Sequence, residues 1–112
     1  MKWSCLILLL ATGCVNPPMV GEFNRIHMDQ YVAGKNDCTN KAGRYARILR
    51  DNGYEADVLL FGKRGFQDHA IVSVNGFYYD PTWGSVKQGW RLRDWTFIRQ
   101  VTDAELEGPE YQ

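Results

Sequence analysis

Metal-ligating and redox-active side chains are scarce in this chain. Three cysteines and two histidines are scattered over 112 residues, too few and too far apart for a zinc ribbon or a zinc finger. A glycine-rich phosphate-binding loop of either common kind is missing as well. The sequence therefore suggests neither a metal nor a cofactor.

A surplus of charge is also missing, because thirteen Lys and Arg residues are balanced by thirteen Asp and Glu residues. Domains that bind nucleic acid usually carry a clear basic excess, so we expect no nucleic-acid partner. Apolar material is plentiful: 45% of the residues are hydrophobic, which excludes a wholly disordered tail. The length fits one domain with one modest core.

The first fourteen residues are typical of an export signal rather than of a fold. Lys2 precedes an apolar run, Trp3 to Ala11, which is much shorter than the ~20 residues of a membrane-spanning helix. Small residues and Cys14 follow, in the order expected of a secretory signal. The segment resembles the lipobox of bacterial lipoproteins, although Ala11 stands where that pattern prefers leucine. A buried N-terminal helix or strand is the alternative interpretation.

The lipobox resemblance implies a signal peptide over residues 1–13, lipidation of Cys14 and a short linker over residues 14–20. Pro17-Pro18 would make this linker stiff. The mature protein would be held at the membrane of the bacterial cell envelope by its lipid anchor. Val15 rather than Asp follows the cysteine, so the expected location in a host with two membranes is the periplasmic side of the outer membrane.

Residues 21–112 form the expected domain, with helices first and strands afterwards, which implies an α+β fold. The expected elements are helices over 22–33 and 38–51, strands over 54–61, 69–74, 77–80 and 95–101, and a helical turn after 102. Gly34 would end the first helix, and Asn36 or Asp37 would cap the second. Gly43 costs a helix ~1 kcal/mol relative to alanine, which indicates close packing. Residues 108–112 are expected to be a frayed tail.

Cys38 would be the one thiol of the mature domain that carries no lipid, because Cys5 would leave with the signal. A lone thiol forms no internal disulfide, and a single Cys with a His elsewhere is a candidate nucleophile. Cys38 stands at the start of an expected helix, where the helix dipole favours the thiolate. The alternative is a small, buried apolar residue.

The second candidate feature is a hairpin that brings a base beside an acid. With Asn75-Gly76 as a type I′ turn, the register places Ile71 opposite Asp80. His69 lies two residues before Ile71 and therefore projects from the same face as Asp80, as its diagonal neighbour. The opposite face would carry the core residues Ala70, Val72, Val74, Phe77 and Tyr79.

Cys38, His69 and Asp80 together supply a nucleophile, a base and a group that fixes the tautomer of the base. Each residue also has a plainer interpretation. His69 would be a partly buried polar residue of a strand, and Asp80 would be a turn former before Pro81. The predicted register favours the joint, catalytic interpretation.

Three segments resemble the transglutaminase-like cysteine enzymes of the papain-like class. These segments are Asn36-Asp37-Cys38, His69-Ala70-Ile71-Val72-Ser73-Val74 and Tyr78-Tyr79-Asp80-Pro81-Thr82-Trp83-Gly84. The resemblance implies N-terminal helices packed on a small antiparallel sheet in a papain/transglutaminase-like core. It also implies Cys38 as nucleophile, His69 as general base and Asp80 as orienting residue, acting on a peptide or protein substrate by hydrolysis or acyl transfer. The chain departs from the family by its shortness and by Ile71, where a tryptophan is usual.

An oxyanion hole would be completed by the backbone N–H of Cys38 and by Gln30 or Tyr31. The tryptophans Trp83, Trp90 and Trp95 are expected in the core rather than in a substrate groove. Two further functions stay open. One is an NlpC-like cell-wall endopeptidase, suggested by Asp37 beside the cysteine. The other is a non-catalytic envelope lipoprotein that binds a partner through a degenerate transglutaminase-like fold.

Overall fold

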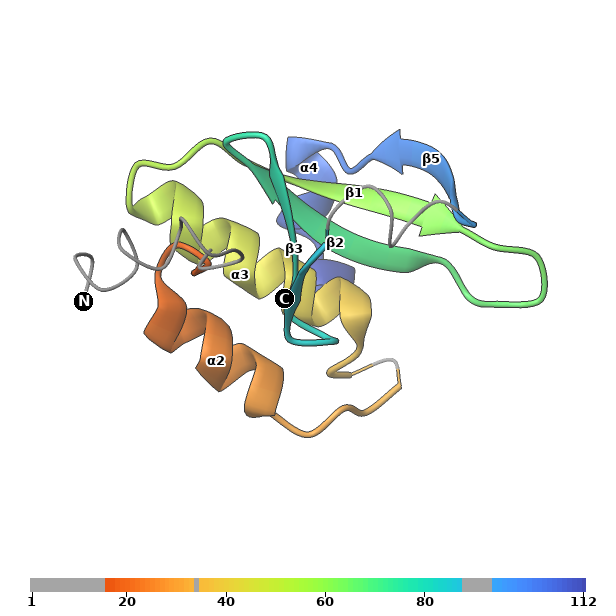
Figure 1. Cartoon of the computed structure of the whole chain (residues 1–112), viewed down its shortest axis with the longest axis horizontal. Coiled ribbons are helices and arrows are strands. Elements are labelled where there is room, and N and C mark those ends of the chain that lie inside the picture. Colours follow the sequence, from red (N-terminus) through yellow and green to blue (C-terminus); the bar gives the residue numbers. More distant parts are fainter. Residues whose placement is uncertain (1–15, 34, 88–93) are drawn as a thin grey trace, which may run out of the picture.

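The computed structural model describes residues 16–33, 35–87 and 94–112. These residues form an α+β domain, which confirms the predicted fold class (Figure 1). The helical elements are α2 (Val20–Met28), α3 (Cys38–Asp51), α4 (Asp103–Leu106) and the 3-10 helix η2 (Pro109–Tyr111). The strands are β1 (Ala56–Gly62), β2 (His69–Val74), β3 (Phe77–Asp80), β4 (Ser85–Lys87) and β5 (Thr96–Gln100). The predicted signal peptide and Cys14 lie outside the described residues.

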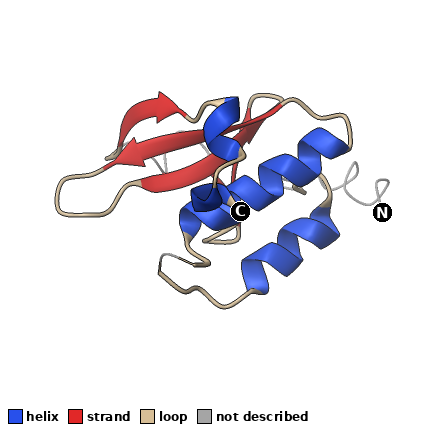
Figure 2. Cartoon of the chain, turned by 180° about the vertical axis from the view of Figure 1, so that it is seen from behind, coloured by secondary structure: helices blue, strands red, loops and turns tan. Residues whose placement is uncertain are grey.

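The strands pair antiparallel in the order β4-β3-β2-β1-β5. Figures 1 and 2 show α3 lying along one face of this sheet, with α2 beside it. The main core is formed between these two layers. Its members come from α2, α3, β1, β2 and β3, and also from Val101, α4 and η2. No helix among the described residues is long and apolar enough to cross a membrane.

Helix α3 begins at Cys38, as predicted, because Asp37 caps it. The Asp37 carboxylate accepts hydrogen bonds from the backbone N–H groups of Thr39 and Asn40, and the Asn40 side chain accepts one from the Asp37 N–H. A cap of this type stabilises a helix by about 1 kcal/mol. The residues of the apolar stripe are fully buried against the sheet: Ala42, Tyr45, Ala46 and Leu49.

Helix α2 is shorter than predicted, because it ends at Met28. The backbone carbonyls of His27 and Asp29 accept hydrogen bonds from the Lys41 ammonium group instead of continuing a helix, at 3.1 and 2.7 Å. This partner lies on another helix, so the local pattern of residues 22–33 did not indicate it. The predicted stop at Gly34 lies outside the described residues.

The hairpin of β2 and β3 has the predicted turn and register. Asn75 and Gly76 have φ angles of 53° and 81°, as the type I′ turn requires at both central positions. The pairs Val72–Tyr79, Ser73–Tyr78 and Val74–Phe77 follow from that turn. The core face is buried as predicted, except that Phe77 is 39% exposed; it stands at the turn, at the end of the strand.

The prediction of a frayed tail over residues 108–112 is wrong. Residues 109–111 form η2, and the Tyr111 side chain is buried. The Asn40 side-chain amide donates to the carbonyls of Glu110 and Gln112, at 3.1 and 3.2 Å. A Cβ on Gly43 would collide with the Tyr111 carbonyl, which explains the glycine inside α3 and confirms close packing there.

Candidate active site

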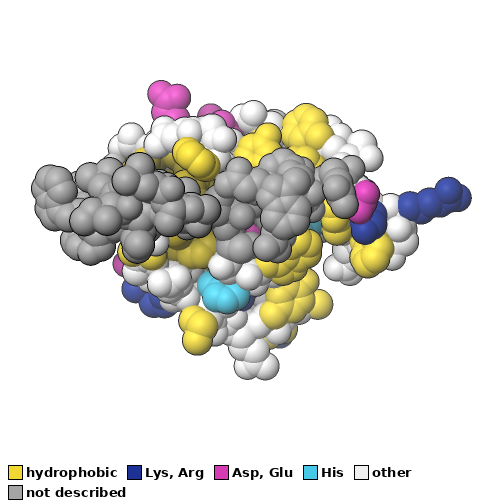
Figure 3. All heavy atoms as spheres, in the orientation of Figure 1, with side chains coloured by type: hydrophobic (Ala, Val, Ile, Leu, Met, Phe, Trp, Pro, Cys, Tyr) yellow, Lys and Arg dark blue, Asp and Glu magenta, His cyan; other side chains and the backbone are white. Residues whose placement is uncertain are grey.

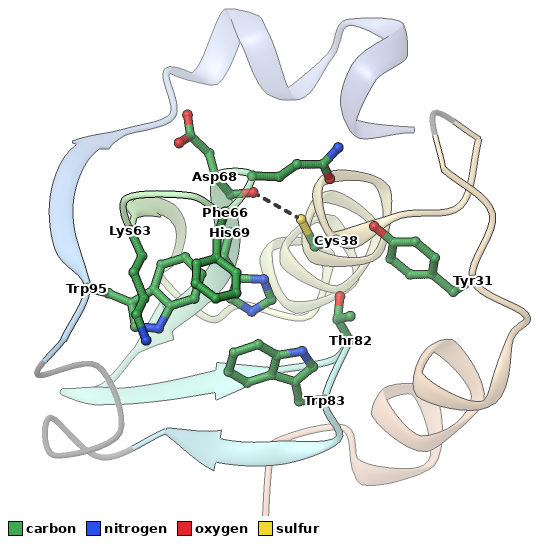
Figure 4. A pocket seen from close by; sticks show the side chains of 10 residues that line it. Tyr31, Cys38, Lys63, Phe66, Asp68, His69, Thr82, Trp83 and Trp95 are labelled. Atoms are coloured by element: carbon green, nitrogen blue, oxygen red, sulfur yellow. Dashed lines mark hydrogen bonds between the residues drawn. The ribbon is translucent and has the colours of Figure 1, made fainter.

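Two of the three predicted site residues, Cys38 and His69, line a cleft of about 610 Å³ between the start of α3 and the end of the sheet (Figure 4), and Asp80 is buried behind His69. Cys38, His69, Thr82, Trp83 and Trp95 line it, together with Tyr31, Lys63, Phe66, Gln67 and Asp68. Several of these side chains are large and half exposed. Figure 3 shows hydrophobic side chains gathered near the middle of one face and a Lys or Arg side chain projecting at its edge.

Cys38 lies in the first turn of α3 and faces the start of β2. Its Sγ donates a hydrogen bond to the backbone carbonyl of Asp68, at 3.7 Å, directly before His69. The side chain is partly exposed to the cleft. The thiol therefore lies beside the imidazole, at the positive end of a fourteen-residue helix, where negative charge is stabilised.

His69 and Asp80 form the predicted pair across two neighbouring strands. The His69 Nε2 lies 2.5 Å from the Asp80 Oδ2, and the two residues are 6% and 0% exposed. The second carboxylate oxygen, Oδ1, accepts the backbone N–H of Trp83 at 3.0 Å. Because both oxygens are held, the carboxylate has one orientation, and it binds the imidazole through Nε2, which leaves Nδ1 for a partner other than Asp80.

The environment of His69 favours the imidazolium form. Burial by itself lowers the pKa of His69. The hydrogen bonds with Asp80 and Cys38 and the charges of both groups raise it by more, so the pKa lies at about 9, above its ordinary value of 6.5. A shift in this direction is expected for an imidazole placed between two acidic groups. At neutral pH the imidazole of His69 therefore holds a proton.

Trp83 and Trp95 line the cleft. The expectation that they belong to the core is wrong for Trp83, whereas Trp95 is partly buried and also packs against the core residues Phe61 and Ile71. Trp83 stacks on the His69 ring with a centroid distance of 4.3 Å and an interplanar angle of 18°, and it is 47% exposed. Trp95 lies 5.9 Å from the same imidazole. Trp90 lies outside the described residues. The turn after β3 places Trp83 over His69. This placement depends on the tertiary fold, and the aromatic content of the sequence does not reveal it.

His27 is a site-supporting residue that the sequence did not reveal. Its Nδ1 lies 3.1 Å from the Pro81 carbonyl and donates to it, and its ring packs so closely on Gly84 that a Cβ there would collide with it. Gly84 also has a φ of 72°, which favours glycine. The turn that carries Trp83 is therefore clamped by α2, a contact between segments more than fifty residues apart.

Two hydroxyl groups, those of Tyr31 and Thr82, lie near Cys38 and His69 at the cleft (Figure 4). The Tyr31 hydroxyl points toward the Cys38 sulfur in Figure 4, and burial together with the charges of Cys38 and Asp37 raises the pKa of Tyr31, so the phenol stays protonated and can donate. Thr82 Oγ1 is buried and has no hydrogen-bond partner among the described residues. Gln30, the other predicted oxyanion candidate, is exposed and does not line the cleft.

The described residues offer no set of side chains that could bind a metal ion. Among residues 16–33, 35–87 and 94–112, no group of three or more His, Cys, Asp and Glu side chains could hold a metal ion.

Comparison with protein-family models, with curated proteins and with solved structures found no match. The geometry of the cleft therefore carries the functional argument by itself.

Proposed function

We propose that this protein is a transglutaminase-like cysteine enzyme with a papain-like core, which acts on peptide or amide bonds. Cys38 is the nucleophile, His69 the general base and Asp80 the orienting residue. One observation carries the proposal: a buried carboxylate holds an imidazole next to a helix-start thiol at the wall of a cleft. This order of groups is the one that nucleophilic acyl transfer requires.

The Cys38 thiol first gives its proton to Nδ1 of His69, and the resulting thiolate attacks the carbonyl carbon of the substrate. The proton held by His69 passes to the nitrogen of the leaving amine, the carbon–nitrogen bond breaks, and a thioester remains on the sulfur. Water or a second amine then loses a proton to His69 and attacks the thioester, which releases the acyl group and restores the thiol. Asp80 keeps the imidazole in place through both steps.

The oxyanion formed in each step needs two donors at the thiol. The backbone N–H of Cys38 belongs to the first turn of α3 and therefore has no carbonyl partner within that helix. The Tyr31 hydroxyl is the second donor, because it points at Cys38 from the other side of the cleft (Figure 4). Tyr31→Phe should slow acylation while leaving the fold intact.

The proposed setting is the bacterial cell envelope. The order of basic, apolar and small residues before Cys14 supports a signal peptide and a lipid anchor, and Pro17-Pro18 supports a stiff linker. A peptide or protein of the envelope is then the proposed substrate.

A non-catalytic binding role is the second candidate. The half-exposed rings of Tyr31, Phe66 and Trp83 favour it, because such aromatic side chains also bind peptides without any chemistry. For the NlpC-like alternative, Asp37 offers no further support, since its carboxylate caps α3.

Alkylation separates an enzyme from a binding module. We expect iodoacetamide to modify Cys38 at pH 6–7 faster than it modifies free cysteine, because imidazolium and helix dipole both favour thiolate. His69→Ala should slow the reaction, whereas His27→Ala, a histidine outside the pair, should slow it less. If Cys38 reacts at the rate of free cysteine and His69→Ala leaves that rate unchanged, the result would contradict the proposed enzyme and favour the binding role.

A further inference from the structure

The cleft is asymmetric about the imidazole. Figure 4 shows Tyr31 at one end, Cys38 and His69 in the middle, and Trp95 with Lys63 at the other end. The Tyr31 end holds a single ring. The opposite end lies beyond His69 and is called the His69 end. It is walled by three aromatic rings: the ring centroids of Trp83 and Phe66 lie 6.4 and 5.9 Å from that of Trp95.

The proposed reaction determines which part of the substrate lies at each end of the cleft. Because Nε2 of His69 is bound to Asp80, Nδ1 must deliver the proton to the leaving amine. The leaving amine must therefore lie beside His69 when the carbon–nitrogen bond breaks, whereas the acyl group extends from Cys38 toward Tyr31. The aromatic rings around His69 accordingly surround the leaving amine and whatever side chain it carries.

Lys63 gives this end a charge. Its Nζ lies 5.1 Å from the centre of the Phe66 ring and 5.8 Å from that of Trp95. No salt bridge joins Lys63 to a carboxylate within the described part of the chain. The Asp68 carboxylate points away from it in Figure 4. An ammonium group beside an apolar wall suits a ligand that joins an apolar group to a carboxylate.

We propose that the His69 end of the cleft is a subsite for an amine that carries a large apolar side chain and a free carboxylate. The simplest such leaving group is the last amino acid of a peptide, so the enzyme would release an aromatic or large aliphatic residue from a carboxyl terminus. This inference rests on the proposed function. In acyl transfer, an acceptor amine of the same chemistry would occupy the same subsite.

The experiment compares four peptides that share one acyl half and end in Phe, Phe-amide, Gly or Gly-amide. Cleavage is followed by mass spectrometry, and kcat/KM is measured for the wild type, Lys63→Met, Trp95→Leu and the control Arg64→Met. Arg64 is an exposed cation one residue further on that does not line the cleft. A hydroxylamine-sensitive thioester on Cys38 is assayed in parallel with an activated ester.

The wild type should cleave the Phe acid about tenfold or more faster than the Phe amide, a ratio typical of one charge-assisted hydrogen bond. Lys63→Met should abolish the preference for the acid and keep the preference for Phe over Gly. Trp95→Leu should reduce the preference for Phe, and Arg64→Met should change neither ratio.

Two results would overturn the subsite and leave the proposed function standing: cleavage with equal rates for acid and amide, or an acid preference that survives Lys63→Met. Failure to cleave any peptide, with no thioester on Cys38, would instead overturn the proposed function and the subsite with it.

Discussion

The buried pair of His69 and Asp80 should make the stability of the domain depend on pH. The pKa of His69 is raised from its ordinary value of 6.5 to about 9, so the folded protein keeps a proton that the unfolded chain loses. This contribution is fully present below pH 6.5 and is lost as the pH rises through 9. At 1.36 kcal/mol for each pKa unit, the loss is about 3 kcal/mol.

The assay is urea unfolding of the wild type and of His69→Gln at pH 6, 7.5 and 9.5. The difference between the two proteins isolates His69, because other titrating groups are common to both. We expect the wild-type advantage to fall by about 3 kcal/mol across this range, and Cys38→Ser to reduce the fall, since the thiol contributes to the raised pKa. A constant difference between wild type and His69→Gln would show that the imidazole is not held as its charged form.

Three further predictions concern other parts of the molecule. Asp80→Asn should keep the fold, measured by circular dichroism, but lower kcat a hundredfold or more, because His69 loses the group that fixes its tautomer; unchanged turnover would contradict the triad. Gly43→Ala should destabilise the domain by about 1–3 kcal/mol through overpacking, whereas Gly21→Ala, which has open space around it, should not; equal thermal midpoints for the two would argue against docking of residues 109–111. Cys14→Ser should release the protein from membrane fractions, and retention there would refute the lipid anchor.

Local chemistry explains why part of the site could be predicted. Asn75-Gly76 sets the turn and register of the hairpin without help from distant residues, so the neighbourhood of His69 and Asp80 followed from the sequence. The Asp37 cap is equally local, and it placed Cys38 at a helix start. That Cys38 lies beside this pair depends on packing of α3 against β2, which no local pattern encodes.

The features that escaped prediction all depend on contacts between distant segments. His27 clamps a turn more than fifty residues away, and Asn40 binds residue 112 across seventy-two positions. Amphipathic periodicity reports which side of a helix is buried but not its partner. The same reason explains why Trp83 was expected in the core and is found at the cleft.

The contacts between α3 and residues 110–112 have a consequence for the timing of synthesis. A chain is synthesised from its N-terminus, so the helix that carries Cys38 is made some seventy residues before the carbonyls that Asn40 binds. Thr39 likewise waits for the Glu110 carbonyl. Helix α3 therefore lacks these contacts until residues 110–112 have been added, and the proposed active site is completed late in synthesis.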